Sequence, residues 1–510
     1  MKRHLLATTA IALIAFSTPA FADNNSVVNS AGVNTATINQ DLGGNITSVN
    51  NSTIDQIGAG TGDAIINQQA NGGLNDSTVT QSTDGGFNSA TVDQIGSSDT
   101  SSNTSSITQA TLGGNNDATV LQNATDNAVN TSSIIQDGDN NSAVVLQDSL
   151  GVTGNTNTSA VSQFGAQNVA IINQNGEANT NDATVDQNGD DNTVDVSQNG
   201  TFNNNVAAIS QDGNAQTAIV AQEGLNNLNA ITVDQTGEAS VATILQTGDN
   251  TSSDAEVTQD GIAQSATVTQ DGTGNNNISR TTQTGDGHIA DTVQSGIGST
   301  NDSEISQAGS ANAAIIVQDG DSTSNTSLSI QLGTGNTTAV AQTGTGAFNT
   351  SSAFINGFDN QAAIQQSADA GINTSSLSQD GDVNIANITQ NGLANTNDSY
   401  IGQTGLDNES IVVQDSENGI NISVIQQDGA NNQANVEQTG FSNTQSSDIT
   451  QFGSLNVANV LQSGDNNFNN SVITQDNDNN VAVITQGGTG NLNNSVINQT
   501  GGSVVTLTQN

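Results

Sequence analysis

The sequence predicts an all-β fold: a β-solenoid of about twenty two-stranded turns in which two parallel sheets face each other. Three observations predict it. Glutamine recurs in alternating steps of 11 and 13 residues from Gln163 to Gln499, a period of 24 residues kept over fourteen repeats. The same residue types recur at every second position before each glutamine, as along one face of a strand. Glycine usually follows two residues later, as a tight turn requires.

Each strand is predicted from the positions that precede its anchor glutamine. The residue six before is usually Asn, the residue four before is Ala or Ser, and the residue two before is Val or Ile. Ile355 stands where one anchor is expected, yet Gly357 follows in phase. The residues predicted to form the structural ladder are Gln163, Gly165, Asn168, Ala170, Gln174, Gln187, Gln379, Gly381, Asn384, Ala386, Gln390, Gln451, Gly453, Asn456, Ala458 and Gln462.

The sheets are expected to arise because one repeat cannot bury its inner face alone. Stacked repeats pair each strand with its copies above and below at about 4.8 Å. Glutamine over glutamine and asparagine over asparagine then form amide ladders, which satisfy polar groups that are costly to bury. Polar tracts of this composition can also indicate disorder. The Val and Ile residues that stay in phase with the repeat favour the solenoid.

Residues 1–22 differ from the rest of the chain and are predicted to be a secretory signal peptide. Lys2 and Arg3 precede a short apolar run, and the small residues around Ala22 predict cleavage before Asp23. The alternative is an uncleaved membrane anchor, for which the apolar run is too short.

Residues 23–162 carry the same repeat with anchor spacings of 11 to 16 residues, and residues 163–510 carry the regular one. We interpret them as one continuous solenoid with longer turns in the first part. The whole chain has 38 anchor glutamines and the gap at Ile355, which predicts about 39 strands. The repeat runs to Gln509 and Asn510 without a visible cap, so an open end is expected to pair with another molecule.

Composition excludes several classes of function. One Pro, no Cys and 2% aromatic residues argue against a disulfide scaffold or an ordinary aromatic core. The formal net charge is −46, and it becomes −48 when Lys2 and Arg3 leave, with Arg280 as the remaining Lys or Arg. So acidic a chain is not expected to bind nucleic acid or anionic lipid, and no membrane insertion is predicted.

No catalytic, cofactor-binding or metal site is predicted. His288 is the single histidine after residue 22 and occupies a position where the repeat usually has Asn. The segments 137–139 and 319–321 read Asp-Gly-Asp and resemble pieces of calcium loops, but no ligand set of the required period or length surrounds them. Solvated turn acids are the preferred interpretation, with weak screening by divalent cations as the alternative.

The 11-residue step resembles the curlin repeat of curli, the secreted amyloid fibres of bacterial biofilms. That family's unit reads Ser-x5-Gln-x-Gly-x2-Asn-x-Ala-x3-Gln. Its five fixed positions after the Ser are matched from Gln163 to Gln174, from Gln379 to Gln390 and from Gln451 to Gln462. The leading Ser is mostly Asn here, and the second arc is two residues longer.

The resemblance implies a structural subunit of extracellular curli-like amyloid fibres that polymerises end to end, without enzymatic activity. It implies that the chain associates mainly with copies of itself, and that a nucleator repeat protein and an outer-membrane secretion pore are further partners. It also implies a cell-surface location reached through the periplasm. The alternatives are a soluble secreted β-solenoid that acts as an adhesin or ice binder, and an enzyme on a parallel β-helix. Whether the chain is a major subunit or a nucleator stays open.

The outward positions differ between the two predicted sheets. In the regular region, 21 of 42 outward sites on the strands that close the 11-residue steps are apolar, against 12 of 42 on the other strands. Such a concentration predicts an interaction face. The alternative is the general preference of β-branched residues for strands.

Overall fold

The computed structural model describes residues 23–43, 48–84, 86–111, 114–149 and 154–510. The predicted signal peptide and its cleavage site at Ala22 lie outside the described residues. The chain forms two compact units, Met1–Ser253 and Asp254–Asn510, and each is considered by itself below. The boundary predicted between residues 162 and 163 marks a change of spacing within the first unit and stays a prediction.

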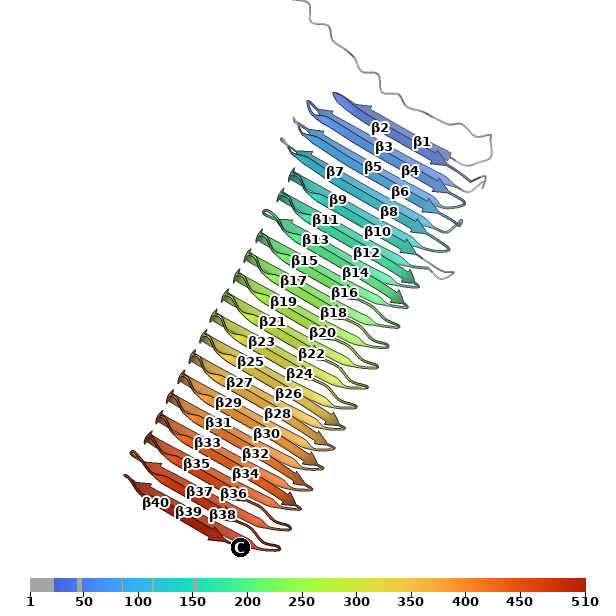
Figure 1. The fold of residues 1–510 in the computed structure, drawn as a ribbon. Coiled ribbons are helices and arrows are strands. Elements are labelled where there is room, and N and C mark those ends of the chain that lie inside the picture. Colours follow the sequence, from blue (N-terminus) through green and yellow to red (C-terminus); the bar gives the residue numbers. More distant parts are fainter. Residues whose placement is uncertain (1–22, 44–47, 85, 112–113, 150–153) are drawn as a thin grey trace, which may run out of the picture. The chain divides into compact units, whose positions relative to one another are not determined.

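In the first unit, successive strands belong alternately to two parallel sheets, A and B (Figure 1). Sheet A contains β1 (Asp23–Ser30), β3 (Val49–Gly58), β5 (Leu74–Thr83), β7 (Ser102–Thr111), β9 (Val129–Asp139), β11 (Thr156–Ala166), β13 (Thr180–Asn188), β15 (Asn204–Asn214) and β17 (Leu228–Glu238). Sheet B contains β2 (Val33–Asp41), β4 (Thr61–Ala70), β6 (Phe87–Gly96), β8 (Asn115–Ala124), β10 (Ser142–Ser149), β12 (Val169–Glu177), β14 (Thr193–Thr201), β16 (Thr217–Gln222) and β18 (Val241–Gln246).

The second unit repeats the arrangement, and β19 (Ser252–Ile262) contains the boundary. Its sheet A strands are β21 (Asn276–Asp286), β23 (Thr300–Ser310), β25 (Ser324–Thr334), β27 (Phe348–Phe358), β29 (Ile372–Asp382), β31 (Thr396–Leu406), β33 (Ile420–Ala430), β35 (Thr444–Ser454), β37 (Phe468–Asp476) and β39 (Leu492–Thr500). Its sheet B strands are β20 (Ser265–Gln270), β22 (Ile289–Gln294), β24 (Ala313–Gln318), β26 (Thr337–Thr345), β28 (Gln361–Asp369), β30 (Ile385–Leu393), β32 (Glu409–Glu417), β34 (Gln433–Phe441), β36 (Val457–Gln462), β38 (Val481–Gln486) and β40 (Val504–Gln509).

The register follows the repeat. Strands one turn apart pair in parallel so that each anchor faces the next, as Gln163 faces Gln187 and Gln56 faces Gln81 in the irregular region. The predicted fold class is therefore confirmed: the described residues form strands and turns without a helix, in about twenty turns. They contain 40 strands, one more than expected, because β1 has Ser30 at the position that aligns with Gln56.

The core lies between the facing sheets and is half polar. In β13, Asn181, Ala183, Val185 and Gln187 are all at most 1% exposed, and the residues between them face outward. The same alternation runs through the strands of each unit. A core that contains two amides per strand is stable only if those amides are hydrogen-bonded, because an unpaired buried polar group costs about 1–3 kcal/mol.

The turns require unusual backbone angles at two positions. Gly381 has φ 126°, and a Cβ added there would collide with the Gly405 carbonyl of the next turn. Two residues later the chain enters the left-handed region, usually without glycine, as at Val383 with φ 59° and Asn431 with φ 54°. The sequence predicted the glycine position; the second left-handed position was not foreseen.

Candidate functional site

The anchor glutamines form side-chain ladders with one direction, interrupted in sheet A at Ile355. In sheet A, Gln163 Nε2 donates to Gln187 Oε1 at 2.8 Å, and Gln187 donates to Gln211 at 2.9 Å. In sheet B, Gln174 Nε2 donates to Gln198 Oε1 at 2.8 Å. Each donor belongs to the earlier turn and each acceptor to the later one. Within each unit the ladders therefore have a polarity along the stacking direction.

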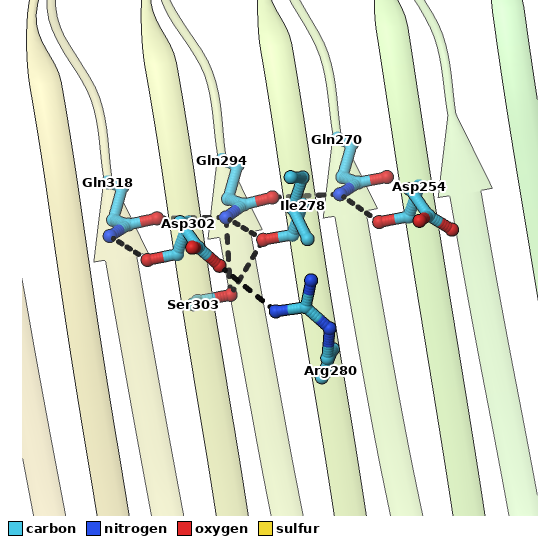
Figure 2. Close-up of polar contacts among 8 residues, drawn as sticks. All are labelled: Asp254, Gln270, Ile278, Arg280, Gln294, Asp302, Ser303 and Gln318. Atoms are coloured by element: carbon cyan, nitrogen blue, oxygen red, sulfur yellow. Dashed lines mark hydrogen bonds and ion pairs between the residues drawn. The ribbon is translucent and has the colours of Figure 1, made fainter.

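The same amides also connect the two sheets. Figure 2 shows three consecutive glutamines of sheet B in the second unit, Gln270, Gln294 and Gln318, each aimed at a backbone carbonyl of sheet A. Gln294 Nε2 donates to the Ile278 carbonyl at 2.8 Å and to Ser303 Oγ at 3.2 Å, besides its ladder bond to Gln318 at 2.8 Å. The Gln294 amide thus donates both along the stacking direction and across to sheet A. The Ser that lies four residues before a sheet A anchor serves as one of its acceptors.

The asparagines of sheet A form a second ladder with the opposite direction. Asn181 Nδ2 donates to Asn157 Oδ1 at 3.0 Å, and Asn397 Nδ2 donates to Asn373 Oδ1 at 2.9 Å. Here the later turn donates to the earlier one. The side-chain dipoles of the two ladders in sheet A therefore oppose each other, which reduces the net dipole that stacking would otherwise accumulate.

The asparagines that precede the sheet B strands form hydrogen bonds with the backbone of the turns. Asn168 Nδ2 donates to the Gly189 carbonyl at 2.8 Å, and its Oδ1 accepts from the Asn192 backbone N–H at 3.1 Å. Asn384 binds Gly405 and Asn408 in the same way. These side chains also face the turn and bond to backbone groups of the next turn, which the sequence did not predict. Direct side-chain contacts are added in the second unit, as from Asn408 Nδ2 to Asn384 Oδ1 at 3.1 Å.

The remaining predicted residues occupy equivalent places in their own repeats. Asn456 Nδ2 donates to the carbonyl that follows the next sheet A anchor, Asn477 O, at 2.7 Å. Gly165, Gly381 and Gly453 open the turns after β11, β29 and β35 with positive φ, and Ala170, Ala386 and Ala458 are fully buried in β12, β30 and β36. The ladder bonds of the other predicted anchors run from Gln379 to Gln403, Gln390 to Gln414, Gln451 to Gln475 and Gln462 to Gln486, at 2.8 to 2.9 Å.

The outer faces carry most of the charge. Arg280, the only Lys or Arg among the described residues, contacts Asp302 with Nη1 at 3.4 Å from Oδ1 (Figure 2). Both side chains are 44–45% exposed, so the pair stabilises the fold little. Arg280 also lies in register with Glu304 on the next strand. It is a local neutralising group on an acidic surface.

His288 has a structural role. It is completely buried, and its Nδ1 accepts the Asn312 backbone N–H at 3.2 Å. Nε2 therefore carries the ring hydrogen and donates to the Thr284 carbonyl at 3.0 Å. Asn168 makes the same two kinds of contact, with the Phe164 carbonyl at 3.2 Å and with the Asn192 N–H, so His288 replaces an asparagine of the turn.

The acidic side chains of the turns accept hydrogen bonds from backbone N–H groups and from neighbouring side chains. Asp139 Oδ1 accepts from the Gly114 N–H at 2.7 Å, and Asp319 Oδ1 accepts from Ser295 Oγ at 2.8 Å. In the described part of the chain no group of three or more His, Cys, Asp or Glu side chains is placed to hold a metal ion. The same residues contain no helix long and apolar enough to span a membrane.

Comparison with known proteins gives one match. The family model of the curlin associated repeat matches residues 129–165, which comprise β9, β10 and β11 as far as Gly165. The match supports assignment to the curlin-repeat family, as the sequence resemblance predicted. It falls on the last part of the irregular repeats and the first regular anchor. No curated protein matched the chain.

Proposed function

We propose that this chain, whose residues 129–165 match the curlin associated repeat, is a subunit of extracellular curli-like amyloid fibres. The repeat and the β-solenoid fold fit a curli-like structural repeat protein. The proposal adds that the subunit polymerises end to end. One turn then stacks on another molecule's turn as it stacks on its own neighbours.

The observation that carries this proposal is the equivalence of successive turns. Each turn presents the same register of backbone groups and the same directed amides to the next one. The Ser503 carbonyl, just before β40, accepts from the Val481 N–H of β38 at 2.8 Å, and the Gln509 carbonyl of β40 accepts from the Gly487 N–H, just after β38, at 2.9 Å. In a parallel ladder, every second residue of a strand directs its N–H away from the neighbouring strand. In β40 the residues whose N–H groups point away from β38 include Thr506. Such an edge is a template for another strand.

Fibre formation by the purified chain from Asp23 onward tests the proposal. We expect fibres with a meridional reflection at about 4.7–4.8 Å and no cleavage beyond the signal peptide. A protein that stays monomeric for weeks at high concentration in moderate salt would contradict polymerisation. That result would favour the alternative function, a soluble secreted solenoid that acts as an adhesin.

A single substitution separates stacking through this edge from other modes of aggregation. Thr506→Pro removes an outward N–H but spares the hydrogen bonds to β38, so the monomer should keep its strand content by circular dichroism. We expect the variant to lose fibre growth, and the control Thr506→Ala to keep it. Equal growth of the two variants would show that this edge is not the site of polymerisation.

The cellular route belongs to the same proposal. A secreted chain must cross the periplasm before it assembles, and the resemblance implies a secretion pore and a nucleator repeat protein as partners. Fibres on cells that express the chain with its first 22 residues, and none on cells that express it from Asp23, would support secretion through the predicted signal peptide. Surface fibres from both forms would contradict it.

A further inference from the structure

The outer face of sheet B in the first unit contains a groove. It crosses β2, β4, β6, β8, β10 and β12 and has a volume of about 850 Å³. Its walls are the side chains immediately before and immediately after each anchor glutamine, and the anchor segments form its floor. The groove therefore runs along the stacking direction, perpendicular to the strands.

Its dimensions restrict the ligand. Six strands give five steps of about 4.8 Å, or a length of about 24 Å. The volume of about 850 Å³ then corresponds to a mean cross-section of roughly 35 Å². The groove suits a single extended chain without bulky substituents better than an α-helix, whose diameter is about 10 Å.

The charges of the walls are regularly spaced. Asp41 lies on β2, Asp93 on β6 and Asp148 on β10, so successive carboxylates are two turns, or about 9.6 Å, apart along the stacking direction. They alternate between the walls, because Asp41 and Asp148 follow their anchors and Asp93 precedes its own. Asn67 Nδ2 donates to Asp93 Oδ1 at 2.5 Å and Asn123 Nδ2 donates to Asp148 Oδ1 at 3.0 Å. These bonds hold two of the carboxylates in the walls.

Apolar side chains occupy the stretch between the charges. Ile95, Leu121 and Leu146 line the groove, and Ile95 and Leu121 are 46% and 43% exposed. Arg280, the only Lys or Arg of the described residues, belongs to the second unit. The groove thus combines spaced negative charge and apolar surface.

We propose that this groove binds a linear oligocation: an aliphatic chain with ammonium groups about 10 Å apart, which matches the two-turn spacing of the carboxylates. The ammonium groups pair with Asp41, Asp93 and Asp148, and the methylene segments contact Ile95, Leu121 and Leu146. Apolar contact adds to the ion pairs because the methylene groups are removed from water. The inference does not depend on fibre formation.

The probe is a linear triamine whose nitrogens are joined by two heptamethylene chains, which places successive nitrogens about 10 Å apart when extended. Spermidine has the same three positive charges at shorter spacing. Isothermal titration of the purified protein at about 0.15 M salt should give binding of the long triamine at least about tenfold tighter than that of spermidine. Equal affinities would mean non-specific attraction to an acidic protein and would overturn the proposal.

Two sets of substitutions locate the site. The triple variant Asp41→Asn, Asp93→Asn, Asp148→Asn should lose the preference for the long triamine and keep its strand content. The control set is Asp380, Asp428 and Asp476, three exposed acids that lie two turns apart on β29, β33 and β37, outside the groove. Changing these three to Asn should leave the preference intact. An unchanged preference in the first variant, or an equal loss in the control, would contradict the assignment.

Discussion

Ile355 on β27 lies in register with Gln379 on β29, and the Oε1 of Gln379 is buried without a hydrogen-bond partner. The previous anchor, Gln331, also lacks its usual acceptor and donates instead to the Asn336 carbonyl at 3.1 Å and to Thr338 Oγ1 at 3.0 Å. One apolar side chain therefore interrupts the ladder of sheet A. The substitution is tolerated because Ile355 is itself completely buried in the core.

Ile355→Gln should stabilise this part of the second unit. The restored ladder bond from Gln331 contributes about 1 kcal/mol, and pairing Gln379 Oε1 removes a cost of about 1–3 kcal/mol. Loss of the buried isoleucine costs roughly 1.5–3 kcal/mol. We expect a net gain of about 1 kcal/mol in the opening free energy of β27 and β29 by amide hydrogen exchange. Ile425→Gln, at a core position outside the ladder, is the control and should destabilise β33; a loss at both sites would contradict the argument.

The asparagine ladder has an equivalent defect at Gln445. Asn421 Oδ1 and Asn469 Nδ2, on the strands before and after it, are buried without partners, as is Gln445 Oε1. The longer side chain turns instead to the Thr439 carbonyl at 2.9 Å. Gln445→Asn should complete the ladder and stabilise β33, β35 and β37 by about 1–2 kcal/mol.

The reverse change is the matched control for this prediction. Asn397 takes part in an intact ladder, donating to Asn373 and accepting from Asn421. Asn397→Gln should therefore destabilise β29, β31 and β33 by a similar amount, measured by the same exchange experiment. If both substitutions changed stability in the same direction, side-chain length and not ladder continuity would determine the effect.

The fold could be predicted because all repeats share one pattern, so that one assignment of inward and outward positions applies to every strand. A residue such as Val185 had to face the core if Gln187 did, since both lie on one face of one strand. β1 was not recognised as a separate strand because Ser30 replaces the anchor. The bond from Gln294 to Ile278 could not be predicted either, because it depends on how far apart the two sheets pack and not on spacing within one strand.

The turns and the groove show a second limit of sequence reasoning. The left-handed residue four after an anchor is often Ala, Asn, Asp or Gly, a weak signal that Val383 and Leu455 obscure. The groove depends on the side chains flanking six anchors, such as Leu121 and Leu146, being long enough to form walls. Side chains from six different turns form those walls, so no pattern within one repeat reveals the groove.

Val383 is a strained residue of the turns. It is β-branched and has φ 59°, a conformation that costs of order 1–3 kcal/mol for a residue other than Gly or Asn. Asn431 occupies the equivalent position two repeats later with φ 54°. Val383→Asn should therefore raise stability by about 1 kcal/mol in urea unfolding. Asn431→Val is the control and should lower it; no difference between the two would contradict strain at this position.

Asp291 gives a pH dependence with a defined sign. Burial raises the pKa of this carboxyl on β22, where it lies in register with Thr267 and Ile315. Above the raised pKa, the ionised group destabilises the folded state; as pH falls through that pKa, the folded state takes up the proton first and the penalty disappears. Asp291→Asn should be more stable than the natural chain at neutral pH, and the difference should vanish below about pH 3.8, the ordinary value. A difference that persists at lower pH would rule out ionisation as its cause.

The apolar outward residues of sheet B are expected to mediate contacts between filaments, if the chain forms them as proposed. Ile171, Ile219 and Ile315 face outward on β12, β16 and β24 and are 38–45% exposed. Exposed apolar side chains at this density indicate an interaction face, whereas β-propensity alone would make them indifferent to charge. Ile171→Lys, Ile219→Lys and Ile315→Glu together should leave single filaments intact and abolish bundles in electron micrographs. The control changes Asp182, Asp186 and Asp234 of sheet A to Asn, and bundles that survive the first set but disappear with the second would assign the contact to sheet A.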